Sequence, residues 1–415
     1  MKYVRTHETR DKFLADKDST SRGFRLAPTL YKYSDESEDE DNRDHIYLEL
    51  DDPRKHEGST YMEIALNSDV EFSFYIDNAP GDTQTTMNCS IDWGDDTIET
   101  KTITKDTHGF KLAHNYVAGS YKIELYDVER DYSVVGNTTN SKSLISPKES
   151  AKRVVLGNSV VSIGEQAFGG FEGSCTSLTS IYIPNSVTYI GDYAFYYCES
   201  LKSINIPESV TSIRRRAFYG CHSLTSIYIP ESVTIIDVNL FAYCHSLTSI
   251  YIPKSVTRIE WGAIAYCYSL KSIYIPEGVT LISGFAFYEC FSLTSVYIPE
   301  SVTSIIRGAF ASCTSLKSID IPRGVTIIDT RVFYNCTSLK SIDIPEKVTS
   351  IGDSAFQDCS SLSSISSFNP TTPTLGGNIF LNLPTNGTLH IKPGATGYDA
   401  WLSKLPEGWR IVEDL

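Results

Sequence analysis

The sequence predicts a mainly β protein in which an immunoglobulin-like β-sandwich precedes a solenoid of 23-residue repeats. Two observations predict the solenoid: cysteine returns nine times at one constant step, and columns of leucine, proline and valine keep the same step. A third observation predicts the sandwich, because short alternating segments separated by turn residues precede the repeats. The nine cysteines are Cys175, Cys198, Cys221, Cys244, Cys267, Cys290, Cys313, Cys336 and Cys359.

The repeat unit reads L-x-S-I-x-I-P-x-x-V-T-x-I-x-x-x-A-F-x-x-C-x-S, and its length lies within the range of leucine-rich repeats, roughly 20–29 residues. One unit has too few apolar residues to form a core, so the units must stack to bury them. We assign residues 151–367 to the solenoid. Its first turn has four additional residues within Gly169–Ser174, and we expect a bulge there.

Residues 368–415 are predicted to cap the solenoid. The repeat pattern ends after Cys359, and Phe368 stands where the repeat has proline. An atypical terminal unit closes the apolar end and the strand edges that a solenoid otherwise exposes.

Residues 59–135 are predicted to form the sandwich. The alternating segments Glu71–Ile76, Cys89–Trp93 and Tyr121–Leu125 are separated by clusters of turn residues. Short alternating strands at this spacing are typical of two packed antiparallel sheets.

The segments on either side of the sandwich are predicted to be linkers. Residues 1–58 form an N-terminal extension, whose acidic run Asp35–Asp41 favours a flexible linker. A calcium loop is the alternative there, but the glycine and the spacing of an EF-hand are absent. Residues 136–150 are polar and form the second linker.

Each S-I-x-I-P segment is predicted to be a short strand, in which the two isoleucines point into the solenoid and the residue between them points outward. Strands one turn apart lie ~4.8 Å apart, so the outward residues form one column. This column is either a ligand-binding face, because tyrosine offers a large contact area at low entropic cost, or a ladder that only stabilises the sheet. The candidate ligand-binding residues are Tyr182, Asn205, Tyr228, Tyr251, Tyr274, Tyr297, Asp320 and Asp343.

The cysteine column is predicted to be buried packing rather than a metal or redox site. The sequence has neither a C-x-x-C pair nor the spacing of a cysteine–histidine zinc site. Thiols stacked in register also suit disulfide geometry poorly. His222 and His245 share a column beside the cysteines and are either a solvated loop pair or a metal site. We expect no metal and no other cofactor.

Charge and hydropathy restrict the partners of the chain. The net charge of −15 argues against general binding to nucleic acid or to anionic membranes. No apolar stretch approaches the length of a membrane-spanning helix, so membrane insertion is not expected. The first 24 residues contain no apolar segment of the kind that a secretory signal peptide has.

The sequence does not predict an enzyme. It has no nucleophile elbow, no metal triad and no phosphate-binding loop. Asp92, Asp95, Asp96 and His114 are the residues that a catalytic cluster would use, but turn hydrogen bonds explain them better.

Residues 151–365 resemble BspA-like leucine-rich repeats, also called the Treponema pallidum type. The matching motif is L-T-S-I-x-I-P-x-S-V-T-x-I-x-x-x-A-F-x-x-C. The tail Leu389–Gly394, together with Tyr398 and Trp401, is similar to the cap that often ends such arrays.

A second resemblance lies in the predicted sandwich. Trp93-Gly94-Asp95-Asp96, followed by His114-Asn115-Tyr116 and Gly119–Ile123, resembles a PKD (polycystic kidney disease) domain, although this family usually has glycine where Asp96 stands. PKD domains are immunoglobulin-like spacers.

The resemblance to BspA-like repeats implies a non-enzymatic binding or adhesion protein, extracellular or on a cell surface, whose tyrosine-rich face meets a protein or glycan on a host or neighbouring cell. The absent signal peptide favours an alternative. In that alternative the chain is a structural protein of a phage virion, attached to a larger particle through its N-terminal extension, and uses the same repeats for attachment to a host. The ligand and the oligomeric state do not follow from the sequence.

Overall fold

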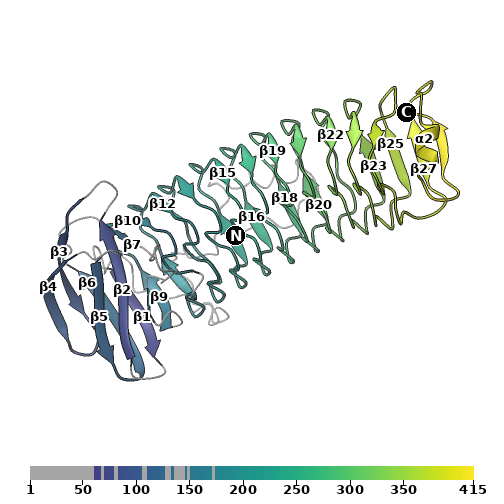
Figure 1. Ribbon diagram of the computed structural model, residues 1–415. Helices are drawn as coiled ribbons and strands as arrows, with labels where there is room; N and C mark the ends of the chain where they lie inside the picture. The colour runs from purple at the N-terminus through teal and green to yellow at the C-terminus, as the bar shows by residue number, and fades with distance from the viewer. Residues whose placement is uncertain are drawn as a thin grey trace, which may run out of the picture. The chain divides into compact units, whose positions relative to one another are not determined.

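The computed structural model describes residues 60–66, 70–78, 83–104, 110–126, 132–134, 145–146, 150–170 and 173–415. The structure is mainly β and contains a β-solenoid of about 11 turns with repeats about 23 residues apart, which confirms the predicted solenoid (Figure 1). The predicted extension 1–58 lies outside the described residues, as does part of the bulge predicted within Gly169–Ser174.

The described chain divides into two compact units. The N-terminal unit comprises residues 60–211 and Ser226–Pro230, and the C-terminal unit comprises Ser212–Thr225 and Glu231–Leu415. Each unit is treated by itself below.

The N-terminal unit contains two sheets. The first has the strand order β11-β9-β1-β6-β3-β4, and the second contains β12-β10-β7-β2-β5, with β8 also pairing with β2. The strands of this unit are β1 (Thr60–Leu66), β2 (Val70–Asn78), β3 (Thr86–Asp92), β4 (Ile98–Thr104), β5 (Phe110–Tyr116), β6 (Gly119–Tyr126), β7 (Tyr132–Val134), β8 (Ile145–Ser146), β9 (Ala151–Val155), β10 (Val160–Ile163), β11 (Ser180–Tyr182), β12 (Tyr189–Ile190) and β14 (Ser226–Tyr228).

The first solenoid turn belongs to these two sheets as well as to the repeats. Strand β9 pairs antiparallel with β1 on one side and parallel with β11 on the other. Strand β10 pairs parallel with both β7 and β12. Backbone hydrogen bonds therefore run without interruption from the strands before residue 135 into the solenoid. Strand β8 lies inside the segment that the sequence predicts as a linker.

The core of the N-terminal unit is formed by side chains from both sheets. Ile91 and Trp93 at the end of β3 are fully buried, and so is Leu112 on β5. The Trp93 indole stacks on the His114 ring of β5, with centroids 5.0 Å apart, so the two sheets are in contact here.

The C-terminal unit consists of repeats followed by the C-terminal strands and one helix. Its elements are β13 (Ser212–Ile213), β15 (Ile235–Ile236), β16 (Ser249–Tyr251), β17 (Arg258–Ile259), β18 (Ser272–Tyr274), β19 (Leu281–Ile282), β20 (Ser295–Tyr297), β21 (Ser304–Ile305), β22 (Ile327–Ile328), β23 (Ser341–Ile344), β24 (Ser350–Ile351), β25 (Ser364–Ser367), β26 (Thr374–Leu375), β27 (Thr388–Ile391), α2 (Asp399–Leu402) and β28 (Arg410–Glu413).

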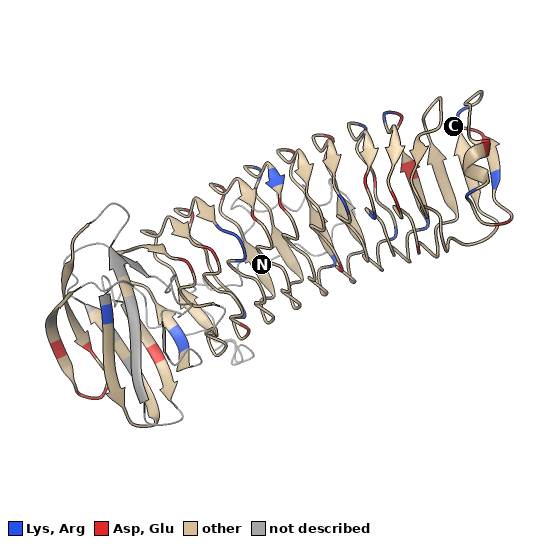
Figure 2. Ribbon diagram, in the orientation of Figure 1, with Lys and Arg blue, Asp and Glu red and all other residues tan. Residues whose placement is uncertain are grey.

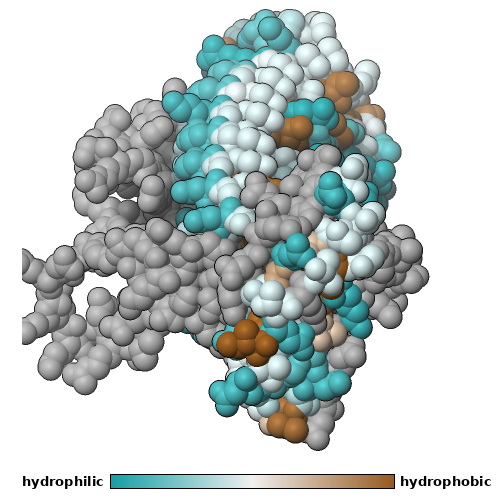
Figure 3. Space-filling view, turned by 90° about the vertical axis from the view of Figure 1, so that its left-hand side faces the viewer, coloured by the Kyte–Doolittle hydropathy of each residue, from teal (hydrophilic) through white to brown (hydrophobic). Residues whose placement is uncertain are grey.

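Stacking keeps equivalent positions together. In the pair β18–β20, Ser272, Ile273 and Tyr274 lie opposite Ser295, Val296 and Tyr297, each one repeat later. A second ladder of short parallel strands runs in the order β15-β17-β19-β21-β22-β24-β26. Residues of similar hydropathy therefore form columns along the repeats. These columns are visible on the face drawn in Figure 3.

Two buried columns form the core of the repeats. Rings of the phenylalanine column stack nearly parallel, as Phe287 does on Phe310 with centroids 5.2 Å apart and planes 3° apart. Thiols of the cysteine column donate toward backbone carbonyls of the preceding turn in at least seven of the described turns, as Cys290 Sγ does to Ile264 O at 3.2 Å. All ten cysteines lie among the described residues, and they are buried and free of disulfides, in agreement with a packing role.

The C-terminal residues continue one of the solenoid sheets. Strands β23, β25, β27 and β28 pair in parallel in this order. Phe380 stacks on Phe356 of the phenylalanine column, and Trp401 of α2 packs on Phe380 with ring centroids 5.7 Å apart. The buried Tyr398 hydroxyl lies 2.6 Å from Ser367 Oγ. Large aromatic side chains therefore cover the end of the column.

Candidate functional site

The eight residues predicted to bind a ligand form the outward column of the S-I-x-I-P segments, here called the tyrosine column. Their side chains differ in exposure. Asp320 and Asp343 are exposed, whereas Tyr251 is buried, with 7% of its surface exposed. The other five are half-buried: Tyr182, Asn205, Tyr228, Tyr274 and Tyr297.

Contacts within the C-terminal unit explain this partial burial. The Tyr274 and Tyr297 rings stack with centroids 4.9 Å apart and planes 5° apart. The Tyr297 hydroxyl donates to Glu277 Oε1 of the preceding turn at 2.9 Å. The Tyr251 hydroxyl likewise donates to Glu231 at 2.6 Å. Tyr274 and Tyr297 therefore support each other and remain partly exposed, whereas Tyr251 is buried.

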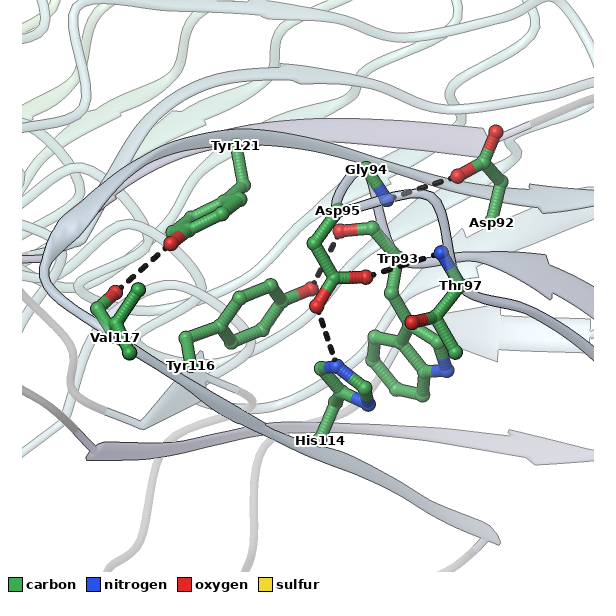
Figure 4. A network of polar contacts seen from close by, with 9 residues as sticks. All are labelled: Asp92, Trp93, Gly94, Asp95, Thr97, His114, Tyr116, Val117 and Tyr121. Atoms are coloured by element: carbon green, nitrogen blue, oxygen red, sulfur yellow. Dashed lines mark hydrogen bonds and ion pairs between the residues drawn. The ribbon is translucent and has the colours of Figure 1, made fainter.

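The N-terminal unit contains a polar network around the turn between β3 and β4 (Figure 4). Asp92 Oδ1 accepts the Gly94 amide at 2.8 Å, and Asp95 Oδ1 accepts the Thr97 amide at 3.2 Å. Asp95 Oδ2 lies 2.8 Å from His114 Nε2. Burial opposes ionisation of Asp95, but the hydrogen bonds from His114 and Thr97 outweigh it and lower the pKa of this carboxyl.

This network fastens the turn to the neighbouring sheet. The buried Tyr116 hydroxyl donates to the Trp93 carbonyl at 2.7 Å. The His114 ring stacks on the Trp93 ring and makes an edge contact with the Tyr116 ring. Asp92 and Asp95 thus make the turn hydrogen bonds that the sequence indicates. Within the described ranges, no three His, Cys, Asp or Glu side chains lie close enough to hold a metal ion.

A second aromatic surface lies in the C-terminal unit, on the turns that follow each A-F pair. We call it the turn-side aromatic cluster. Its rings form one connected set of contacts, for example Tyr243 on Tyr266 with centroids 4.1 Å apart and Tyr268 on Phe291 with centroids 5.0 Å apart. The cluster consists of Tyr219, His222, Tyr243, His245, Trp261, Tyr266, Tyr268, Phe285, Tyr288 and Phe291.

Two apolar residues of the cluster are the most exposed. Trp261 is 46% exposed and Phe291 is 38% exposed. Charged residues of the repeats lie mainly in the loops between strands (Figure 2). The rings of this cluster come from tyrosine, tryptophan, phenylalanine and histidine. Burial lowers the pKa of His245, and the neighbouring His222 lowers it further, so the histidine is neutral near pH 7.

Three residues of the cluster occupy turn positions whose left-handed backbone conformation recurs along the repeats. Tyr243, Tyr266 and Phe285 have φ angles of 63°, 60° and 55°, in the left-handed region. Glycine fills the equivalent positions in other turns, as Gly220 and Gly308 do with φ of 72° and 65°. Other side chains adopt the same conformation at these positions, as Arg216, Ser312 and Asp358 do, so the left-handed conformation belongs to the repeat and not to the cluster.

His222 and His245, which the sequence presents as a solvated loop pair or a metal site, belong to the aromatic cluster. Their rings stack with centroids 4.6 Å apart and planes 2° apart, and His245 also stacks on Tyr268. Parallel rings direct their nitrogen lone pairs side by side rather than toward one metal ion. The cluster itself was missed, although its sequence signal is visible as aromatic residues in the variable positions beside the cysteine column.

Among the described residues, no helix has the length and apolar character needed to cross a membrane.

Comparison with known proteins identifies the repeats. The model of the family described as BspA type leucine rich repeat region matches residues 161–290 and 280–394, more than half of the chain. No curated protein matches the chain.

Three solved structures are similar to it. A leucine-rich repeat protein from Bacteroides ovatus is 26% identical, with 61% of this chain and 88% of that protein covered and a TM-score of 0.31. A leucine rich cell surface protein from Faecalibacterium prausnitzii is 29% identical, with 61% and 82% covered and a TM-score of 0.34. A Treponema pallidum leucine rich repeat protein is 28% identical, with 51% and 77% covered and a TM-score of 0.31.

Proposed function

Because the chain belongs to the BspA-type leucine-rich-repeat family, we propose that it is a non-enzymatic binding protein that attaches to a protein or glycan on a host or neighbouring cell. The tyrosine column is the surface that we propose for this attachment. The observation that supports it is the fixed stack of Tyr274 on Tyr297, whose hydroxyl is held by Glu277. Side chains ordered before binding lose little entropy when a ligand arrives.

Exposed charged residues flank the tyrosines on both sides, so the two edges of this surface can differ in charge. Lys271 and Lys317 precede the strand segments and are exposed, while Glu277 and Glu300 follow them and are exposed as well. At Tyr274 a ligand lying across the column would meet Lys271 on one side and Glu277 on the other, whereas Lys254 and Arg323 replace the carboxylate in two other turns. Such a pattern supports recognition of a partner with polar groups of both kinds.

A role without catalysis is supported by the chemistry of the Asp95–His114 pair. Asp95 accepts a backbone amide of its own turn, and the His114 ring is packed on Trp93, so both groups are committed to structure. We propose that the strands around this pair form a PKD-like spacer. The cell surface is the proposed location, because the family that the repeats resemble consists of surface proteins.

The experiment compares three versions of the full chain in attachment to epithelial cells, measured by flow cytometry of fluorescently labelled protein. Tyr274→Ser with Tyr297→Ser removes the exposed ring edges, and Tyr274→Phe with Tyr297→Phe keeps the rings. Since hot-spot truncations cost about 2 kcal/mol or more, we expect the serine variant to bind at least about tenfold more weakly. Tyr251 is unsuited to this test because it is buried.

The phenylalanine variant is the matched control for the stack itself. It should retain most of the attachment, and far-UV circular dichroism should show that both variants are folded. Attachment of a folded serine variant at the level of the parent would mean that the column is only a structural ladder.

A further inference from the structure

The turn-side aromatic cluster has no part in the proposed role of the tyrosine column. We propose that this cluster is a second binding surface, for a neutral glycan, with Trp261 and Phe291 as the rings on which sugar units stack. The proposal rests on the proposed function only in taking the chain as a binding protein, and it concerns different residues. Exposed aromatic groups of this extent usually mark contacts with a ligand or partner.

The position of Trp261 is the first argument. A Cβ atom added to Gly284, one turn later, would lie 2.5 Å from Cζ3 of the indole. The six-membered ring of Trp261 thus occupies the space of the missing side chain, while 46% of the residue remains exposed. Phe285 lies in the same way over Gly308, where an added Cβ would be 2.6 Å from its ring. The chain therefore pairs each of these rings with a glycine that makes room for it.

The orientation of the other rings is the second argument. His222, His245, Tyr268 and Phe291 form a row in which successive planes differ by 2°, 5° and 14°. Phe291 ends this row, because the next turn has Thr314 at the equivalent position, so only one side of the Phe291 ring is stacked on a ring of the row. The rings of the row repeat at the spacing of the turns, ~4.8 Å. A ligand with hydroxyl groups that recur along a chain matches this array better than a single compact group does.

The polar atoms of the cluster are the third argument. The phenols of Tyr266, Tyr268 and Tyr288 are protonated at neutral pH. Those of Tyr266 and Tyr288 are hydrogen-bonded to Tyr243 and Glu289, and each oxygen keeps a lone pair for a donor of the ligand. A protonated phenol both donates and accepts a hydrogen bond, as sugar hydroxyls do. Apolar rings together with a few such groups are what a sugar, with its C–H faces and hydroxyl edges, requires.

The charge distribution favours a neutral ligand. Glu260, next to Trp261, is paired with Arg258 at 2.8 Å, so the surroundings of the indole carry no uncompensated charge on that side. Glu289 is the carboxylate within the row of tyrosines, and its charge contributes to raising the pKa of the Tyr268 and Tyr288 phenols. In a chain of net charge −15, an anionic glycan would be repelled. Glu260 is engaged with Arg258 and Glu289 with the Tyr288 hydroxyl, which leaves little to attract a basic peptide.

The test uses intrinsic fluorescence, because the four tryptophans differ sharply in exposure. Trp93, Trp401 and Trp409 are 0%, 1% and 6% exposed, so a ligand that reaches tryptophan from solvent reports on Trp261. The full chain is titrated with soluble dextran, mannan, arabinogalactan and xylan, and binding is also followed by affinity electrophoresis in gels that contain each polysaccharide. We expect at least one to change the emission and retard the chain.

The variants locate the binding. Trp261→Ala and Phe291→Ala should each weaken retardation at least tenfold, and Trp261→Phe, which keeps an aromatic ring, should restore part of it. Leu381→Ala is the matched control, because Leu381 is also 46% exposed and lies outside the cluster, and it should bind like the parent. The serine variant of Tyr274 and Tyr297 should bind the polysaccharide normally, which separates this proposal from the previous one.

Three results would overturn the proposal: no binding to any of the four polysaccharides, unchanged binding by the folded Trp261→Ala variant, or binding that grows with the sulfate content of a charged glycan such as heparin. Epithelial cells oxidised with periodate, which cleaves vicinal diols of sugars, give an independent result. If attachment depends on Trp261 but survives the oxidation, the occupant is a protein and the glycan proposal is wrong.

Discussion

Removing one ring from the phenylalanine column should test whether stacking along the solenoid axis stabilises the C-terminal unit. Phe310 is fully buried, and its ring lies 5.2 Å from the Phe287 ring and 6.0 Å from the Phe333 ring. Phe310→Ala removes a buried ring and leaves a cavity between two neighbours that are fixed by their own turns. Such replacements cost about 3–5 kcal/mol, and the loss of two aromatic contacts favours the upper half of this range.

The chain itself offers the matched control. Ile264 occupies the same repeat position as Phe310 and is equally buried, so the fold accepts isoleucine there. Phe310→Ile should therefore cost less, roughly 1–2 kcal/mol.

Thermal unfolding followed by far-UV circular dichroism measures both variants. For a unit of this size 1 kcal/mol corresponds to roughly 2–4 °C, so the alanine variant should melt about 8–20 °C below the parent. If the alanine variant melts within about 2 °C of the parent, or no lower than the isoleucine variant, the column does not hold the turns together in the way argued here.

Two further predictions concern the thiols and the glycine beside Trp261. Burial raises the pKa of the Cys290 thiol to about 12, above its ordinary value, so its contribution to stability is complete below about pH 8.5 and is lost as the pH rises toward 12. Ellman's reagent at pH 8 should therefore leave the folded chain unmodified and label all ten cysteines in denaturant, and rapid labelling of the folded chain would contradict this. Gly284→Val should displace the Trp261 ring at a cost of about 1–3 kcal/mol and increase quenching of tryptophan fluorescence by iodide, whereas Gly377→Ala, which meets only a contact at 3.7 Å, should change neither.

The sequence predicts the solenoid well because its folding information is periodic. A buried column such as Cys290 and its equivalents must keep one residue type in every turn, since each copy packs on the next. The same reasoning predicts the inward isoleucines, and Ile273 and Ile275 are buried as expected. It does not predict that Tyr251 is buried, because that depends on the path of a side chain toward Glu231 and not on strand alternation.

The junction at residue 151 shows a second limit of the sequence. The segment before it is polar and indicates a linker, but β9 pairs with β1 of the preceding strands and with β11 of the next repeat. Pairing between distant segments depends on free backbone groups, which every residue has, and so leaves little trace in composition. The predicted ligand role of the tyrosine column stays a prediction for a related reason, since exposure alone does not identify a ligand.

Comparing the turns of this chain with one another separates folding requirements from local function. Positions that face the core keep leucine, isoleucine, phenylalanine and cysteine in nearly every turn, because stacking imposes them. The position directly after the cysteine is free of that requirement. It holds His222, His245, Tyr268 and Phe291 in four successive turns and then Thr314 and Thr337.

Stacking would tolerate threonine throughout, so the aromatic run is confined to one part of an otherwise uniform scaffold. A folding role would be needed in every turn, whereas a ligand of limited length needs such a run in only a few. The restriction of the cluster to these turns is therefore what a binding surface of finite length requires.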